Sequence, residues 1–399
     1  EMALAGEELT VTWTVENNSF GETRRNWNDS IYLSQTPSRF DSGSQALFLG
    51  NVRNPNGLPP MASYTNTKTF ALPPSATGQY VIVETSLSDE DRTNNTGVAE
   101  TQVTRASADL VITALDSFGI PYSGEAITVE YTVTNQSDVT LWPGTEYWTD
   151  QIWLSKDEVF SVGGGRDFLV PALRSTNLAD VTHGNSTPLG PGESYTESVE
   201  VTLPQGIGGD FHLHVFTNVN NTRNPASDPA TWPQPPTRGL SHFRTRAFED
   251  LTNNAARLDQ PVTYREPDLQ VTSLVLPPSA QAGSTIEATY TVTNVGDRET
   301  RQQAWYDRFF LSFDSSLDGQ DFRLEEITND GKTNPAELRR MGSLAPGDSY
   351  QGTVRFTVPF EIEGTFNVIG YVDAGFGNSG IDKSNRQTSN IADGFPGIA

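Results

Sequence analysis

Three aspartates occupy the same place in a repeated motif, and they are the residues best placed to do chemistry. Asp29, Asp150 and Asp307 each follow a tryptophan by two residues and precede an apolar residue by two. Residues two apart in a strand share a face, so each carboxylate is predicted to lie among apolar side chains. A carboxylate in such a place needs hydrogen-bond donors or a cation, and the sequence leaves both alternatives open.

Other residue types that support catalysis are sparse. The chain has no cysteine and four histidines, and no Gly-x-Ser-x-Gly motif accompanies its serines. His212 and His214 share a face of a predicted strand, but an exposed strand face explains this pair better than a metal site, because the other copies have no counterpart. We therefore predict that the chain is not an enzyme.

The aspartates belong to a sequence that is repeated three times. Residues 6–17, 124–135 and 283–294 each begin with Gly, alternate apolar with polar residues and end in Asn. This alternation, rich in Thr, Val and aromatics, predicts a half-buried strand. The motif Trp-x-Asp-x-x-x-Leu-Ser follows in every copy and predicts a second strand, which carries the aspartate.

Two further motifs complete each copy. A proline turn leads into a third strand, and a Gly-x-Tyr or Gly-x-Phe segment predicts the penultimate strand. Short, evenly spaced strands with Gly, Pro and Asn punctuation predict an all-β chain of three tandem immunoglobulin-like β-sandwich domains. The turns are residues 58–64, 189–195 and 344–350, and the penultimate strands are residues 78–83, 209–215 and 364–369.

The domain boundaries follow from two similar segments, residues 108–112 and 267–271, which open the second and third copies. The predicted domains are residues 1–106, 107–265 and 266–399. The first copy has no such opening strand, so we expect the chain to be a piece of a longer array.

The second copy differs from the others by an insertion at residues 218–247, which is rich in proline and contains Trp232. Long loops of this kind are usually functional or disordered. Trp232 has the side chain to stack on a sugar or a neighbour, but packing against its own domain is the commoner outcome.

The order of these motifs resembles the CARDB module, the cell-adhesion-related domain found in bacteria. The Trp-x-Asp motif, the Leu-x-Pro-Gly-x-Ser-Tyr turn, the strand ending in Pro and an acidic Asn-Asn close carry the resemblance, which covers the whole chain. It implies immunoglobulin-like sandwiches used in tandem on large secreted or surface-anchored microbial proteins. The third copy departs from the pattern at its close, near Asn390, which puts an ion site there in doubt.

Calcium is the expected cofactor at one end of each sandwich. In an immunoglobulin-like topology the loop before the aspartate strand lies at the same end as the acidic loop between the last two strands. Carboxylate and carbonyl oxygens gathered there suit Ca²⁺. A separate acidic cluster follows the Trp motif of the third copy, where a solvated turn is the alternative. The candidate ligands are Asp29, Glu90, Asp91, Asp109, Asp150, Glu249, Asp250, Asp268, Asp307, Asp314, Asp318 and Asp321.

The charge of the chain excludes some partners. Fifty acidic residues oppose 26 basic ones, giving a net charge of −24, which repels phosphate backbones and anionic lipid surfaces. Its apolar runs are far shorter than the roughly 18 residues that a membrane span requires. We expect neither nucleic-acid binding nor membrane insertion of this segment.

These observations together predict a non-catalytic fragment of a large secreted or surface-anchored microbial protein, located outside the cell or on its surface. Its repeats would act as adhesion or spacer modules, bound to a cell-surface or matrix component or to neighbouring copies of the same protein. Two alternatives remain. The repeats could be accessory modules of a secreted hydrolase, or a filament or surface-layer subunit that assembles by donating a strand to a neighbour's incomplete first domain.

Overall fold

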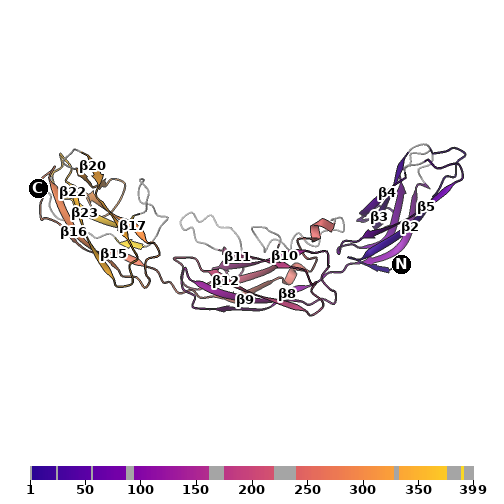
Figure 1. The fold of residues 1–399 in the computed structure, drawn as a ribbon, viewed down its shortest axis with the longest axis horizontal. Helices are drawn as coiled ribbons and strands as arrows, with labels where there is room; N and C mark the ends of the chain where they lie inside the picture. Colours follow the sequence, from indigo (N-terminus) through magenta and orange to yellow (C-terminus); the bar gives the residue numbers. More distant parts are fainter. Residues whose placement is uncertain are drawn as a thin grey trace. The chain divides into compact units, whose positions relative to one another are not determined.

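The computed structural model describes residues 2–23, 26–54, 57–86, 94–160, 175–219, 240–327, 332–374 and 388–390 of the chain. Over these residues the protein is all-β, and its strands form immunoglobulin-like β-sandwiches in tandem, which confirms the predicted fold class (Figure 1). Two short 3-10 helices, η3 (Leu240–Phe243) and η4 (Leu251–Asn253), lie in the second copy. None of the helices in the described part is long and apolar enough to cross a membrane.

The first copy consists of two sheets around one apolar core. Leu9 and Val11 from one sheet pack in the same cluster as Ile31 and Leu33 from the other. The first sheet has the order β1 (Met2–Leu4), β7 (Thr96–Thr104), β6 (Gly78–Thr85), β3 (Trp27–Ser34) and β4 (Leu47–Asn54), and the second sheet pairs β2 (Glu8–Glu16) with β5 (Ser63–Ala71).

The second copy has the same plan, with one strand fewer in its first sheet and one more in its second. Its Asp150 strand, β10, is again central in its sheet, between β11 and β13. The first sheet has the order β11 (Ser175–Gly184), β10 (Tyr147–Ser155), β13 (His212–Val219) and β14 (Ala255–Asp259), and the second has the order β12 (Ser194–Thr202), β9 (Ala126–Asn135) and β8 (Leu110–Phe118).

The third copy repeats the plan, and its core includes Tyr290, Trp305, Phe309 and Phe356. A small extra pair, β19 (Glu325–Ile327) and β20 (Thr333–Pro335), adds to its two sheets. One sheet has the order β22 (Ser349–Thr357), β16 (Thr285–Asn294), β15 (Asp268–Val275) and β24 (Thr388–Asn390); in the other, β17 (Ala304–Ser312) pairs with β18 (Phe322–Arg323), β21 (Glu337–Met341) and β23 (Asn367–Ala374).

Threonine explains the outer face of β2 in the first copy. Along β2 and β5, Thr10, Thr12 and Thr14 meet threonines of the neighbouring strand through hydroxyl pairs of 2.8, 3.0 and 2.8 Å. The alternate positions turn inward and are apolar. Cross-strand Thr pairs favour sheet pairing and keep the outer face polar, so the period-two pattern sets both faces of the strand.

The chain groups into two compact units. One comprises residues 1–121, 126–203 and 210–261, and the other comprises residues 122–125, 204–209 and 262–399. The first unit therefore holds the sheets of two repeats. The predicted boundaries at residues 106/107 and 265/266 stay a prediction, and most of the predicted insertion, including Trp232, lies outside the described residues.

Candidate functional site

Each sandwich contains one fully buried carboxylate at a repeated position. Asp29 on β3, Asp150 on β10 and Asp307 on β17 are all 0% exposed. They lie on the inner face because strand parity groups them with the preceding tryptophan and the following apolar residues. The aspartate of each copy thus faces the second sheet across the core.

In the second copy, Asp150 receives four hydrogen bonds. Its Oδ2 accepts from the hydroxyls of Tyr131 and Tyr195 at 3.1 and 2.7 Å, and its Oδ1 accepts from the Thr217 hydroxyl at 2.7 Å and the Asn218 amide at 3.1 Å. Burial raises the pKa of Asp150, and these four donors oppose that shift. All four donors to this carboxylate are neutral groups.

In the first copy, an indole takes the place of one tyrosine. Asp29 Oδ2 accepts from Trp13 Nε1 at 2.8 Å, from the Tyr64 hydroxyl at 2.7 Å and from Asn54 Nδ2 at 3.0 Å. Within the described residues, Asp29 Oδ1 and the Thr85 hydroxyl are buried and have no hydrogen-bond partner. Three donors therefore converge on one oxygen of this carboxylate.

In the third copy, an arginine joins the network. Asp307 accepts from the hydroxyls of Tyr290 at 2.7 Å and Tyr350 at 2.9 Å, and Arg340 Nε donates to it at 3.2 Å. The Arg340 guanidinium also lies 4.2 Å from the centre of the Tyr350 ring. Burial raises the pKa of Asp307, and the tyrosine donors and the positive charge of Arg340 oppose that shift.

The common element is a polar link between the two sheets of a sandwich. The aspartate lies on a central strand of one sheet, and two aromatic donors, such as Tyr131 on β9 and Tyr195 on β12, come from the other sheet. Hydrogen bonds to an ionised acceptor are stronger than neutral ones. The chain has no cysteine, and this network joins the two sheets at the core in the way that a disulfide does in antibody domains.

Sequence reasoning missed the aromatic donors, although a signal for them was present. Tyr64, Tyr195 and Tyr350 end the same proline-turn motif in each copy, and Trp13 and Tyr131 align in the repeated strand that precedes the aspartate strand. An aromatic side chain that carries an N–H or O–H at every repeat indicates a fixed hydrogen-bond partner in the core.

A second pair of positions beside each aspartate holds different residues in the three copies. One position lies opposite the motif tryptophan in the aspartate's sheet, and the other lies on the facing sheet. In the third copy the first position holds Arg340, and Gly352 faces it; any Cβ at Gly352 would collide with the guanidinium and with the Tyr290 ring. In the second copy the same positions hold His183 and Glu197, whose Nδ1 and Oε1 are 3.1 Å apart. The His183 ring also stacks on Tyr195, with centroids 3.7 Å apart.

The first copy has an amide pair at these positions. Asn66 Nδ2 donates to Asn54 Oδ1 at 3.2 Å, and Asn54 in turn donates to Asp29. Each copy therefore has a different pair of residues beside its aspartate, with one residue on each sheet. The pairs are Asn54 and Asn66, His183 and Glu197, and Arg340 and Gly352.

In the second copy, the structure brings two predicted calcium ligands together through Asn218. The Asn218 backbone amide donates to Asp150, and its side-chain amide donates to Glu249. Glu249 also accepts from the Leu110 amide at 2.6 Å and from Asn254 Nδ2 at 2.7 Å. Burial raises the pKa of Glu249 to about 8, against the effect of these donors.

Asp109 and Asp250 lie beside this group as partners of η4. Asp250 caps the helix by accepting from the Thr252 amide at 3.1 Å, and Asp109 Oδ1 accepts from Asn253 Nδ2 at 2.9 Å. Both carboxylates are thus engaged with the backbone or side chains of one short helix.

The remaining candidates have local partners or lie outside the described residues. Asp268 begins β15, and its amide donates to Asn294 Oδ1 at 3.0 Å. Asp314, Asp318 and Asp321 accept backbone amides of their own turn, at 2.7, 2.8 and 2.6 Å. Glu90 and Asp91 fall within the part of the first copy that the structure does not describe.

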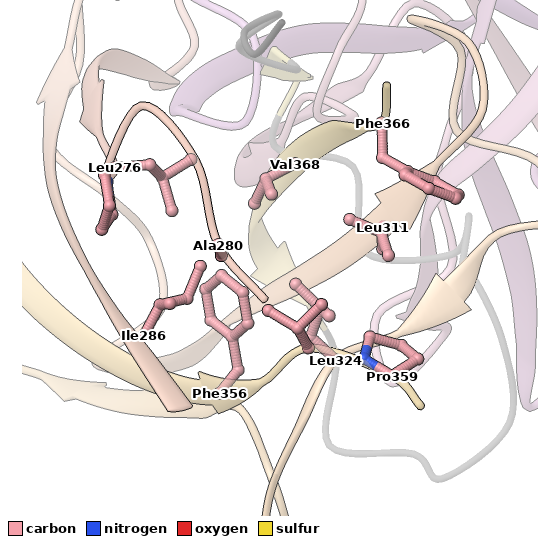
Figure 2. Close-up of a pocket in the computed structure, with 11 residues that line it drawn as sticks. Leu276, Ala280, Ile286, Leu311, Leu324, Phe356, Pro359, Phe366 and Val368 are labelled. Carbon is pink, nitrogen blue, oxygen red and sulfur yellow. The ribbon is translucent and has the colours of Figure 1, made fainter. Parts of the chain in front are cut away.

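Over the described ranges, no three His, Asp or Glu side chains are grouped so that they could hold a metal ion. The calcium role stays a prediction. A hollow in the third copy, shown in Figure 2, is lined by apolar side chains such as Leu276, Ile286, Phe356 and Val368, which lie around it from several strands. Its walls offer apolar packing and no side chain that would orient a polar substrate.

No family model matches the sequence, and no curated protein matches it either. Among solved structures, the chain is similar to Escherichia coli alpha-2-macroglobulin activated by porcine elastase, at 12% sequence identity and a TM-score of 0.21. The match covers 93% of this chain and 30% of that one, so the chain spans under a third of that protein's length.

Proposed function

We propose that the chain is a non-catalytic part of a secreted or surface-anchored microbial protein, in which CARDB-like sandwiches act as spacer or adhesion modules. The observation that carries the proposal is the repeated aspartate network. A catalytic carboxylate keeps an oxygen open to substrate, whereas the three aspartates are all 0% exposed, and donors from the facing sheet hold each of them. The buried polar groups that the copies share therefore join the two sheets of each sandwich.

A spacer must resist separation of its sheets when the chain is pulled. Each network links strands of the two sheets that are not consecutive in sequence, such as β10 and β12 in the second copy, and β17 and β22 in the third. Several hydrogen bonds to one buried carboxylate must break together before either sandwich opens, which makes this arrangement suited to a load-bearing module.

Pulling the chain from its two ends in a single-molecule force experiment tests the mechanical part of the proposal. We expect separate unfolding events of similar height, and a lower force for one event in the Asp150→Asn variant. A variant of an exposed residue, Glu200→Gln, is the control and should leave every event unchanged. Unfolding at forces close to thermal noise would contradict a load-bearing role.

The location and the absence of catalysis need separate tests. An antibody against the chain should label intact cells of the source organism as strongly as permeabilised cells. Labelling only after permeabilisation would contradict a surface location. Turnover of a glycan or peptide by the purified chain, abolished by Asp150→Asn or by a substitution of His183, would contradict a non-catalytic role.

A further inference from the structure

Two glycine turns of the chain are each held by a side chain of the following repeat. Trp142 Nε1 donates to the Gly6 carbonyl at 3.1 Å. Arg301 Nη1 donates to the Gly124 carbonyl at 3.3 Å. The positions match, because both glycines open the repeated strand of their copy, and both donors lie seven residues after the Asn that ends this strand in the next copy. Each contact lies inside one compact unit of the chain.

The loop after the repeated strand fixes the place of the donor. In the second copy Asn135 Nδ2 donates to the Val139 carbonyl at 2.8 Å, and the Leu141 amide donates to the Leu189 carbonyl at 2.9 Å. The matching bonds of the third copy run from Asn294 to Arg298 and from Thr300 to Leu344, at 2.6 and 3.1 Å. These bonds do not involve the side chain of the seventh residue, so the loop presents that residue in the same way whatever its type.

The receiving turn is suited to glycine alone. Gly6 and Gly124 have φ values of +85° and +65°, a region that residues with a side chain rarely adopt. A Cβ at Gly6 would displace the Trp142 ring, and one at Gly124 would displace the Arg301 guanidinium. Each donor therefore occupies the space that a side chain at the glycine would need.

An acidic residue fixes the guanidinium at the second of these contacts. Arg301 donates through Nε and Nη2 to Glu266 Oε2 at 3.0 and 2.6 Å, and Nη2 also donates to the Ser123 carbonyl at 3.0 Å. Glu266 Oε1 accepts from the Gly206 amide at 2.7 Å. A planar guanidinium serves several acceptors at once, so Arg301 and Glu266 together hold two turns of the second copy, residues 122–125 and 204–209.

We propose that the residue seven positions after the terminal Asn is the docking residue of the second and third repeats, and that it recognises the glycine turn of the repeat before it. The chemistry required is a side-chain N–H that reaches the glycine carbonyl, which an indole and a guanidinium both supply. This inference concerns how the repeats are joined, and it stands whether or not the chain is a surface spacer.

The two docking residues are not interchangeable. Trp142 offers one N–H and an aromatic ring that lies against the turn, whereas Arg301 offers charge-assisted bonds. Arg301→Trp would remove the charged partner of Glu266, whose side chain is only 11% exposed. The docking residue therefore selects which repeat can follow which.

Hydrogen exchange of the full chain, read by mass spectrometry, tests the second contact. Arg301→Ala should speed exchange in residues 122–125 and 204–209 by about tenfold, because bonds to a charged group are lost, and should leave β9 and β12 unchanged. Arg355→Ala is the matched control, since this exposed arginine of the third copy pairs with Glu287. It should leave both turns as they are.

The receiving side is tested by Gly124→Ala, which should reproduce the faster exchange in residues 204–209 by displacing Arg301. Because both changes act through one contact, the double variant should exchange no faster than either single variant. Gly283→Ala is the control for backbone strain, since Gly283 has a similar φ of +78° and a Cβ there would meet Phe360 of its own copy.

The first contact is tested with two substitutions of the same residue. Trp142→Phe keeps a ring on the turn and removes the N–H, so exchange in residues 5–7 should rise several-fold, and Trp142→Ala should raise it further. Neither variant should alter exchange in residues 204–209, which Arg301 and Glu266 hold.

Three results would overturn the proposal. One is exchange in both sets of turns that docking-residue substitutions leave unchanged. The second is additive effects of Arg301→Ala and Gly124→Ala, which would mean that the glycine serves its own backbone and not the docking residue. The third is equal acceleration in β9 and β12, which would make Arg301 a residue that stabilises the whole second sandwich.

Discussion

The second and third sandwiches bury an aspartate at the same position but stabilise its carboxylate with different groups. Asp150 is held by neutral donors alone, whereas Asp307 also contacts the guanidinium of Arg340 at 3.2 Å. The tyrosines from the facing sheet are common to both. The comparison teaches that the fold requires donors from the opposite sheet at this position, and that a compensating positive charge is one of several ways to complete the set.

The largest effect is expected from Asp307→Asn. The substitution leaves the partly buried Arg340 without its carboxylate, and breaking one side of such a pair costs about 4 kcal/mol. Hydrogen exchange in β16 and β22 should report this loss of stability. Asp150→Asn is the matched variant and should cost only about 1 kcal/mol in β9 and β12, because the hydroxyl donors can turn and the buried charge is removed. Equal losses in the two copies would contradict the comparison.

The pH dependence of stability should differ between the two sandwiches. Glu249 belongs to the acidic close that the third copy lacks, and its folded-state pKa is raised from 4.5 to about 8. The folded state therefore holds a proton that the unfolded state releases, so the stabilisation is complete below pH 4.5 and is lost as the pH rises through about 8. We expect the second copy to lose about 4 kcal/mol between pH 5 and 8.5.

Scanning calorimetry at the two pH values measures this loss, and the transition that Asp150→Asn shifts identifies the second copy. Glu249→Gln removes the titrating group and should flatten the profile, even though its amide faces the Leu110 N–H and lowers stability at every pH. A melting temperature of the second copy that rises with pH would show that Glu249 is ionised when folded.

Removing the arginine should convert the third network into one like the second. Arg340→Gln deletes the charge next to Asp307 and should cost about 2 kcal/mol, because a hydrogen bond to a charged group is lost. Arg355→Gln is the control, since the Arg355–Glu287 pair is exposed on both sides and should be worth less than about 0.5 kcal/mol. Equal losses for the two variants, measured by hydrogen exchange in β22, would mean that Arg340 is dispensable.

Calcium should have the smallest effect. If the acidic end of the second copy binds Ca²⁺ with a Kd of about 1 mM, calcium at ten times Kd stabilises it by about 1.4 kcal/mol and chelator reverses the change. Asp150→Asn should weaken the effect more than Asp157→Asn, since Asp157 follows the other end of β10. Melting curves that do not respond to calcium or chelator would leave the hydrogen bonds as the full account of these aspartates.

The sequence was sufficient to predict the sandwich and the strand that carries each aspartate. Period-two alternation places Asp150 with Trp148 and Ile152, because this pattern is a property of a single strand. The donors could not be predicted in the same way. Tyr131 and Tyr195 come from two strands of the facing sheet, so their meeting with Asp150 depends on sheet packing and register, which no single strand encodes.

The residue opposite the motif tryptophan, Arg340 or His183, was harder still to predict. Arg340 lies opposite Trp305 across β17 and β21, the place that His183 takes opposite Trp148. The segments that carry these residues share no motif, so their equivalence emerges only from strand pairing. The same limit applies to Glu249, whose sequence context indicated a calcium ligand while the structure places it among amide donors.

The missing side chain at Gly352 sets a rule for anyone who builds chimeras from these modules. A strand exchange that brings Glu197 with β12 into the third sandwich would drive its side chain into the guanidinium of Arg340 and the ring of Tyr290. Transplanting β9 and β11 with β12, so that Tyr131 and His183 travel with Glu197, keeps the matched contacts intact. The smallest interchangeable cassette in this array is therefore a three-strand block that spans both sheets.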